Sequence, residues 1–166
     1  MAYVLEKKIV AAADGAIPRR SVAQSALVVD DDHCLLQVVS EMLGVLGFRS
    51  DSANGGHSAM RCLSQSRYDV MITDLQMPDM DGFALSCWLK HKWKDAKVIV
   101  MTGSHPSDWV DYMHTGIVDR WISKPFSLTK LAGILDGLVP TDSLKRFARL
   151  SGHHGSAYYD RESSAP

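Results

Sequence analysis

The sequence predicts an α/β domain in which five strand–helix units wind around a parallel sheet, with helices on both of its faces. From Ala26 onward, short apolar runs alternate with amphipathic stretches of helical length, and five such pairs can be counted. The 166 residues, 46% of them hydrophobic, suffice for one compact domain and are too few for two of ordinary size. Polar residues suited to chemistry follow the apolar runs, at the carboxyl ends where parallel sheets hold their ligands.

The first two units cover residues 26 to about 65. The first predicted strand, Ala26–Val29, ends in three aspartates, and the helix after it carries apolar residues at helical spacing over 35–46. Gly47 is placed to end that helix. A weaker second strand is expected over 48–53, and Asn54-Gly55-Gly56 then leads into a short amphipathic helix.

The third and fourth strands enclose the segment richest in motif residues. The third predicted strand, 69–73, is almost wholly apolar and is followed directly by Asp74. We expect a loop over 75–82, because its proline and its terminal glycine both disfavour regular structure. The helix after this loop buries one face over 83–89, and the fourth predicted strand is Val98–Met101.

The fifth unit begins after Thr102-Gly103-Ser104. A helix is expected around 109–113, and Gly116 can end it. A short fifth strand at Trp121-Ile122 precedes Lys124-Pro125, whose peptide bond we predict to be cis.

The last predicted helix begins at Ser127, which we expect to be the final helix N-cap, and continues through Leu138 until Pro140 ends it. The predicted division is an N-terminal extension (1–24), one domain (25–139) and a C-terminal tail (140–166). The tail contains a basic amphipathic fragment over 144–150, either a solvated face or a short helix packed back onto the domain. The polar segment after it is expected to be disordered.

The composition excludes several classes of function. Lysine and arginine number 18 against 19 aspartates and glutamates, so no overall field draws the chain to nucleic acid or to an anionic membrane. We expect neither DNA binding nor a membrane association, since Lys145, Arg146 and Arg149 are too few to change this balance. The three cysteines contain no C-x-x-C pair that would indicate a zinc site or a disulfide framework. No uninterrupted apolar run resembles a signal peptide, and the cytoplasm is the expected location.

Five residues placed at predicted strand ends point to one chemistry. Asp30 and Asp31 close the first strand, Asp74 the third, Thr102 the fourth and Lys124 the fifth. Carboxylates gathered at one edge repel each other unless a cation offsets their charge, and an all-oxygen ligand set favours Mg²⁺. Asp74 is then suited to attack phosphorus, while Lys124 and the Thr102 hydroxyl stabilise the charge that develops on the phosphoryl oxygens.

These residues resemble the response-regulator receiver domain family, which combines an acid pair, a phosphoacceptor Asp in a D-x-x-M-P-x-M-D-G loop, a Thr or Ser, and Lys-Pro. Here the loop is Asp74-Leu-Gln-Met-Pro-Asp-Met-Asp-Gly82, and the resemblance covers roughly Ser25 to Val139. It implies a flavodoxin-like three-layer sandwich, (βα)5, with strand order 2-1-3-4-5. It also implies that Asp74 accepts a phosphoryl group from a histidine kinase or a histidine phosphotransfer protein, in a two-component or phosphorelay system.

The resemblance assigns a metal-binding role to four residues. Asp31 and Asp74 would ligate Mg²⁺ directly, the backbone carbonyl of Gln76 would add a third ligand, and Asp30 would act through a metal-bound water. Thr102 would bind the phosphoryl oxygens together with the Lys-Pro lysine.

The resemblance also assigns a switch and two residues that tune hydrolysis. Thr102 and the aromatic residue of the fifth strand, here Trp121 in place of the usual Tyr or Phe, would couple phosphorylation to a surface that binds an unknown target. Gln76 and Ser104 occupy the positions that tune hydrolysis. Neither is a strong base, which predicts self-dephosphorylation that depends on the metal.

Two other functions compete with this reading. A phosphohydrolase of the haloacid-dehalogenase type also uses a strand-end Asp and Mg²⁺, but it requires a second carboxylate two residues later, where this chain has Gln76. A docking module that keeps the fold without being phosphorylated would need no intact acidic site, and Trp121 leaves that alternative open. We therefore expect a phosphoacceptor switch and not an enzyme.

Overall fold

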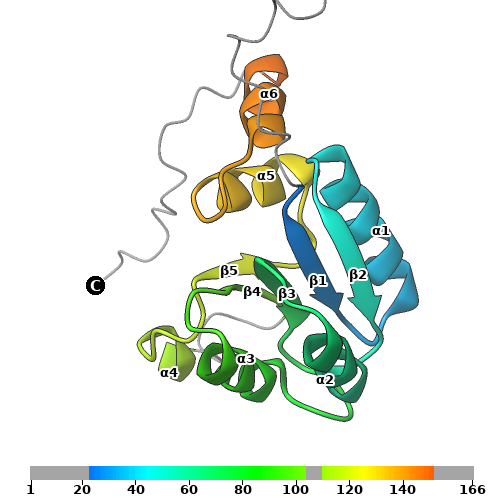
Figure 1. Cartoon of the computed structure of the whole chain (residues 1–166), viewed down its shortest axis with the longest axis vertical. Coiled ribbons are helices and arrows are strands. Elements are labelled where there is room, and N and C mark those ends of the chain that lie inside the picture. The colour runs from blue at the N-terminus through cyan, green and yellow to red at the C-terminus, as the bar shows by residue number, and fades with distance from the viewer. Residues whose placement is uncertain (1–22, 104–109, 152–166) are drawn as a thin grey trace, which may run out of the picture.

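The computed structural model describes residues 23–103 and 110–151, and the five parallel strands in this part form one sheet of order β2-β1-β3-β4-β5. Figure 1 shows the sheet between two groups of helices. The strands are β1 (Ser25–Val29), β2 (Arg49–Ala53), β3 (Val70–Asp74), β4 (Lys97–Thr102) and β5 (Arg120–Ser123). The helices are α1 (His33–Val45), α2 (Gly56–Gln65), α3 (Gly82–Lys92), α4 (Val110–Met113), α5 (Leu128–Asp136) and α6 (Asp142–Leu150).

The strand order confirms the predicted fold class. β1 pairs with β2 on one side and with β3 on the other, so the chain reverses its direction of travel across the sheet after β2. Right-handed crossovers then place the helices before and after this reversal on opposite faces. In such sheets the reversal leaves a crevice at the carboxyl ends of the two central strands, here β1 and β3.

Two hydrophobic cores lie on the two faces of the sheet. Val28 points into the core under α1 and α5, whereas its neighbours Leu27 and Val29 point into the core under α2 and α3, as the two-residue repeat of a strand requires. Figure 1 shows these two helix pairs on opposite sides of the strands. The central strands are therefore buried on both faces, which explains their nearly continuous apolar sequences.

Side-chain caps and a glycine mark the ends of several helices, and they confirm the predicted roles of Gly47 and Ser127. Asp32 caps α1 by accepting hydrogen bonds from the backbone N–H groups of Cys34 and Leu35, at 2.8 and 3.3 Å. Gly47 follows α1 with a φ of +85°, a left-handed conformation that favours glycine. Ser127 caps α5, and the Lys124–Pro125 peptide bond is cis, as predicted.

The end of the last predicted helix differs from the expectation. α5 ends at Asp136, and Leu138 and Val139 form a turn whose N–H groups both return to the Leu135 carbonyl. Ser127 is also not the final N-cap, because Thr141 caps α6 by accepting a hydrogen bond from Leu144 N at 3.0 Å. The sequence leaves open whether the basic fragment after Pro140 is a solvated face or a docked helix, and so it predicts no cap there.

α6 packs back onto the domain, which decides between the two alternatives for this fragment. Leu144 is only 1% exposed and belongs to the core under α1 and α5, while Phe147 packs against the same cluster. The helix begins so close to Gly47 that a Cβ atom there would lie 2.4 Å from the Ser143 hydroxyl oxygen. In Figure 1, α6 (orange) continues from α5 at one end of the molecule.

Two further points concern the limits of the described chain. None of the helices in residues 23–103 and 110–151 is long and apolar enough to cross a bilayer. Ser104, predicted to tune hydrolysis, and Trp109, expected in the helix before Gly116, lie outside the described residues, as do the N-terminal extension up to residue 22 and the tail after 151.

Candidate functional site

The residues singled out at strand ends converge at one edge of the sheet. Asp30 follows β1 directly, Asp74 ends β3, Thr102 ends β4 and Lys124 follows β5. Backbone hydrogen bonds continue the pairing past these ends, since Leu75 N donates to the Met101 carbonyl at 3.0 Å and Lys124 N donates to the Thr102 carbonyl at 2.7 Å. The strand pairing itself therefore sets the spacing between the functional side chains.

Three carboxylates form the centre of this site. One oxygen from each of Asp30, Asp31 and Asp74 lies within 4.8 Å of the other two. Asp30 is 1% exposed and Asp74 9% exposed, whereas Asp31 is exposed and forms the open side of the cluster. The arrangement combines two buried acids with one that reaches solvent.

Lys124 is the cation that faces these acids. Its Nζ atom lies 2.7 Å from Asp30 Oδ2 and 2.9 Å from Asp74 Oδ1, so the ammonium bridges the ends of β1 and β3 from the end of β5. One positive charge against three carboxylates leaves the cluster negative. Further positive charge is needed at this edge before all three acids can be ionised at low cost.

The pKa values of the bridged pair reflect this balance. Burial raises the pKa of the Asp74 carboxyl, and the hydrogen bond and charge of Lys124 only partly offset that effect. Burial alone would lower the pKa of Lys124, but its contacts with Asp30 and Asp74 outweigh burial and raise it. Lys124 therefore stays charged, and burial disfavours the ionised form of Asp74.

The donor set fits a small hard cation. Carboxylate oxygens are the protein ligands that Mg²⁺ prefers, and this ion keeps several waters when protein supplies only part of its coordination. The exposed side of Asp31 leaves space for such waters. Within the described residues this is the cluster of three acids whose oxygens come close enough together to share one ion.

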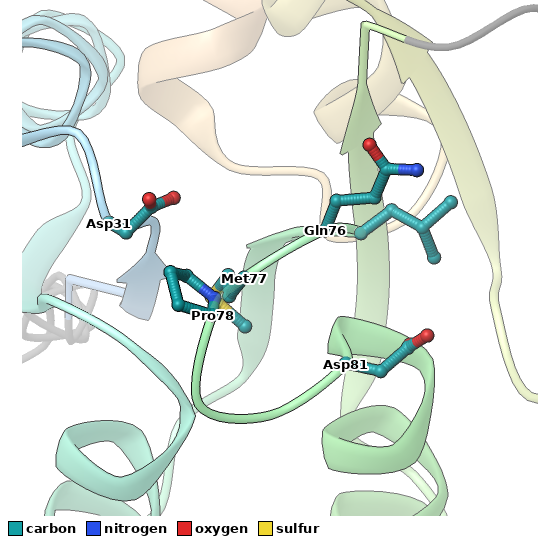
Figure 2. Close-up of a pocket in the computed structure, with 6 residues that line it drawn as sticks. Asp31, Gln76, Met77, Pro78 and Asp81 are labelled. Atoms are coloured by element: carbon teal, nitrogen blue, oxygen red, sulfur yellow. The ribbon is translucent and has the colours of Figure 1, made fainter.

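An open pocket of about 430 Å³ adjoins the carboxylates. Figure 2 shows Asp31 on one side of this pocket and the loop between β3 and α3 on the other, with the Gln76 side chain pointing away from Asp31. The pocket is lined by Asp31, Leu75, Gln76, Met77, Pro78 and Asp81. The carboxylates can thus be reached from solvent through this pocket, along the surface of the β3–α3 loop.

The far end of the loop is fixed against Asp74. Gly82 N donates to the Leu75 carbonyl at 2.9 Å, and a Cβ atom on Gly82 would lie only 1.8 Å from the Asp74 carbonyl oxygen. Only glycine permits this approach. Asp81 then caps α3 by accepting a hydrogen bond from Phe83 N at 2.6 Å.

The middle of the loop is held by Asp79, whose role the sequence did not reveal. The Asp79 carboxylate accepts hydrogen bonds from Gly56 N at 3.0 Å and His57 N at 2.9 Å, at the start of α2. These bonds lower the pKa of Asp79 to about 2. The one available signal was the pair Gly55-Gly56, which gives α2 no capping side chain of its own.

The predicted switch residues lie at β4 and β5. Thr102 is 1% exposed at the end of β4, in register with Ser123 of β5. Trp121 is partly buried and packs against the core under α2 and α3, whereas its neighbour Ile122 points into the opposite core. The indole is therefore on the sheet face that carries α3, not the face that carries α5.

Comparison with known proteins decides the family. Residues 26–136 match the response regulator receiver domain family. This chain is a receiver domain. It is 32% identical over 142 residues to hybrid signal transduction histidine kinase L of Dictyostelium discoideum, an alignment that covers 80% of this chain and 8% of that kinase.

Solved receiver structures have the same architecture. Chemotaxis protein CheY4 of Vibrio cholerae is 25% identical, with a TM-score of 0.66 over 70% of this chain and 99% of that protein. Response regulator TrrA of Thermotoga maritima, solved with Mg²⁺ and BeF, is 28% identical, with a TM-score of 0.64 and the same coverage. The chain spans 8% of the length of the Dictyostelium kinase and 51% of that of transcriptional regulatory protein PmrA of Pectobacterium parmentieri.

Proposed function

We propose that this receiver is a phosphoacceptor switch in which Asp74 takes a phosphoryl group from a phosphohistidine of a histidine kinase or a phosphotransfer protein. The observation that carries the proposal is the bridge from Lys124 to Asp30 and Asp74 beside the exposed Asp31. An Asp74 oxygen forms the new bond to phosphorus as the P–N bond breaks, and the imidazole retains that electron pair and takes up a proton. We also propose a cytoplasmic location, where free thiols such as exposed Cys34 stay reduced.

The residues around Asp74 have distinct tasks in this proposal. Asp31 and Asp74 would ligate Mg²⁺ together with the Gln76 backbone carbonyl, and Asp30 would act through a bound water. When bound, Mg²⁺ offsets carboxylate charge and attracts phosphoryl oxygens. Lys124 is held within salt-bridge distance of Asp74 Oδ1 and stabilises negative charge that develops on the transferred group.

The response to phosphorylation would pass through Thr102 and Trp121. Thr102 ends the strand next to Asp74, from where its hydroxyl can turn toward a phosphoryl oxygen. Movement of that hydroxyl opens space beside β5, and the surface of α4, β5 and α5 changes its affinity for a downstream protein when Trp121 repacks. An indole needs more room than the phenol usual in this family, so we expect a larger repacking.

Phosphorylation of the purified chain tests the proposal. Incubation with acetyl phosphate and Mg²⁺, followed by intact-protein mass spectrometry, should add one phosphoryl group to the wild type and none to Asp74→Asn. EDTA should abolish the addition. EDTA added after phosphorylation should also slow loss of the group, because neither Gln76 nor Ser104 is a strong base and self-dephosphorylation should therefore depend on the metal. Asp81→Asn is a matched control, since it removes an acid from the same edge without touching the carboxylate cluster. Labelling of Asp74→Asn to the wild-type extent would refute the assignment.

A phosphoryl mimic separates the switch from its rivals. Beryllofluoride with Mg²⁺ should change the tryptophan fluorescence of the wild type, and Trp121→Phe should remove most of that change. A phosphohydrolase is disfavoured because Gln76 is no acid, and steady release of phosphate from a generic monoester would reinstate it. Wild-type binding of a target by Asp74→Asn under conditions of active kinase would favour the phosphorylation-independent docking module.

A further inference from the structure

The amino end of α2 has no capping side chain of its own. Its N-cap residue is Gly55, which makes no side-chain hydrogen bond to the first turn of the helix. Asp79, which lies 23 residues after Gly56 and 22 residues after His57, instead accepts hydrogen bonds from their backbone N–H groups. Its Oδ2 atom also lies 3.0 Å from Nδ1 of the His57 ring. The cap of α2 is therefore a contact between two loops at the site edge.

The contact is close enough to fix the position of the β3–α3 loop. A Cβ atom on Gly55 would lie 2.9 Å from Asp79 Oδ1, and one on Gly56 would lie 2.4 Å from the Met80 Cβ. Gly55 also has a φ of +133°, which side chains rarely adopt. The two glycines thus allow the loop to rest on the helix terminus.

In the sequence of the β3–α3 loop, Asp79 stands between the residues that line the pocket and the end of the loop that is fixed at Gly82. Gly82 fixes one end against the Asp74 carbonyl, and Leu75 fixes the other through its bond to β4. The segment between them, which includes Gln76, Met77 and Pro78, faces Asp31 across the pocket of Figure 2. Apart from these ends, the described side-chain hydrogen bonds that hold this segment to another element come from Asp79.

We propose that Asp79 is a positioning residue for the cation site: by capping α2 it sets the distance between the Gln76 backbone and the carboxylates of Asp31 and Asp74. This inference rests on the proposed function, because it assumes that the carboxylates bind Mg²⁺. Groups that orient ligands without touching the metal commonly change its affinity by about 10–100-fold. A loop contact acts less directly than a hydrogen bond to a ligand, so the expected change is smaller.

Titration of Mg²⁺ into three variants tests the inference, with amide chemical shifts as the readout. Asp79→Ala should weaken Mg²⁺ binding by about threefold to tenfold. Asp79→Asn loses the charge and one of the two acceptor oxygens but keeps the other, so it should lose clearly less Mg²⁺ affinity than Asp79→Ala. Thr141→Ala removes a cap of the same kind from α6, far from the loop, and should leave the Kd for Mg²⁺ unchanged.

A second variant perturbs the same contact from the helix side. Gly56→Ala leaves Asp79 intact but places a methyl group against Met80, and it should also weaken Mg²⁺ binding by about threefold. Gly133→Ala is its control, because a Cβ there meets nothing within 4 Å. If Asp79→Ala does not fold, Gly56→Ala and its control Gly133→Ala still show whether the contact between the loop and α2 sets the Mg²⁺ affinity.

The outcomes separate this inference from the proposed function. Equal losses in Asp79→Ala and Asp79→Asn would show that the capping oxygen kept by Asn contributes nothing to Mg²⁺ binding, and would overturn the positioning role. Wild-type affinity in Asp79→Ala, with the Gly56 and His57 amide signals shifted by the lost cap, would overturn it as well. In either case a wild type that binds Mg²⁺ and is phosphorylated leaves the proposed function standing, whereas a wild type that binds no Mg²⁺ overturns both.

Discussion

Replacement of Asp74 by Asn should make the protein more stable when no divalent cation is present. At an effective dielectric constant of about 20, the attraction between Asp74 and Lys124 at 2.9 Å amounts to roughly 6 kcal/mol. Repulsion from each of Asp30 and Asp31, whose oxygens lie within 4.8 Å, amounts to roughly 3.5 kcal/mol. The two repulsions together slightly exceed the attraction, and burial adds to the cost of the charge. We therefore expect Asp74→Asn to stabilise the fold by about 1–2 kcal/mol.

Thermal unfolding in EDTA at pH 7 measures this effect, and the midpoint should rise by about 3–10 °C. The pKa of Asp74 is raised in the folded protein, so the wild type gains stability as the pH falls through that value. The gap between variant and wild type should therefore close toward acid pH. Added Mg²⁺ should also narrow this difference in stability, because the ion binds the native wild type more tightly than it binds the native Asn variant.

Two results would contradict the electrostatic reasoning. The first is an Asn variant less stable than the wild type in EDTA at pH 7. The second is an equal gain in Asp81→Asn, which removes an exposed charge at the same edge and should change stability by less than about 0.5 kcal/mol. An equal gain would mean that general charge reduction, and not the crowding of three acids, is responsible.

Three further changes should give large differences in the free energy of unfolding. Gly82→Ala should lower the free energy of unfolding by at least about 3 kcal/mol, because its Cβ would lie 1.8 Å from the Asp74 carbonyl oxygen. Gly133→Ala, in open space on α5, should raise it by up to about 1 kcal/mol. Urea unfolding measures both changes. Leu144→Ala should lower the free energy of unfolding by about 2–5 kcal/mol, whereas Leu150→Ala, at a side chain that is 86% exposed, should leave it almost unchanged. Equal effects of the two substitutions would show that α6 is not docked on the domain. Asp79→Ala should cost about 1 kcal/mol at neutral pH. Since the pKa of Asp79 is depressed to about 2 from 3.8, that stability is complete above pH 3.8 and is lost as the pH falls toward 2; a constant difference across this range would contradict the cap.

The sequence predicted the sheet and the gathering of acids at one of its edges because both depend on local patterns. Apolar runs defined the strands, and the pairing of parallel strands then brought Asp30, Asp74 and Lys124 to one edge without further information. The same reasoning could not find Asp79, since its hydrogen-bond partners lie 22 and 23 residues away and depend on how two loops meet.

The C-terminal fragment shows a second limit of local patterns. Its three basic residues suggested solvent exposure, and they are exposed, but the apolar side of the same helix supplies Leu144 to the core. Whether an amphipathic helix docks depends on a complementary surface elsewhere in the fold. Here that surface includes Gly47, whose missing side chain leaves space for the start of α6.

The position of α6 offers a practical attachment point. Its first residues rest beside Gly47, next to the start of β2, so the helix lies at the amino ends of the strands while the acids lie at the carboxyl ends. A fluorophore coupled through Leu150→Cys, with the native thiols replaced, would sit on a projecting turn remote from the carboxylates. The fluorescence anisotropy of such a label would report the binding of a phosphodonor protein at the carboxyl ends of the strands. The label itself would not block that binding surface.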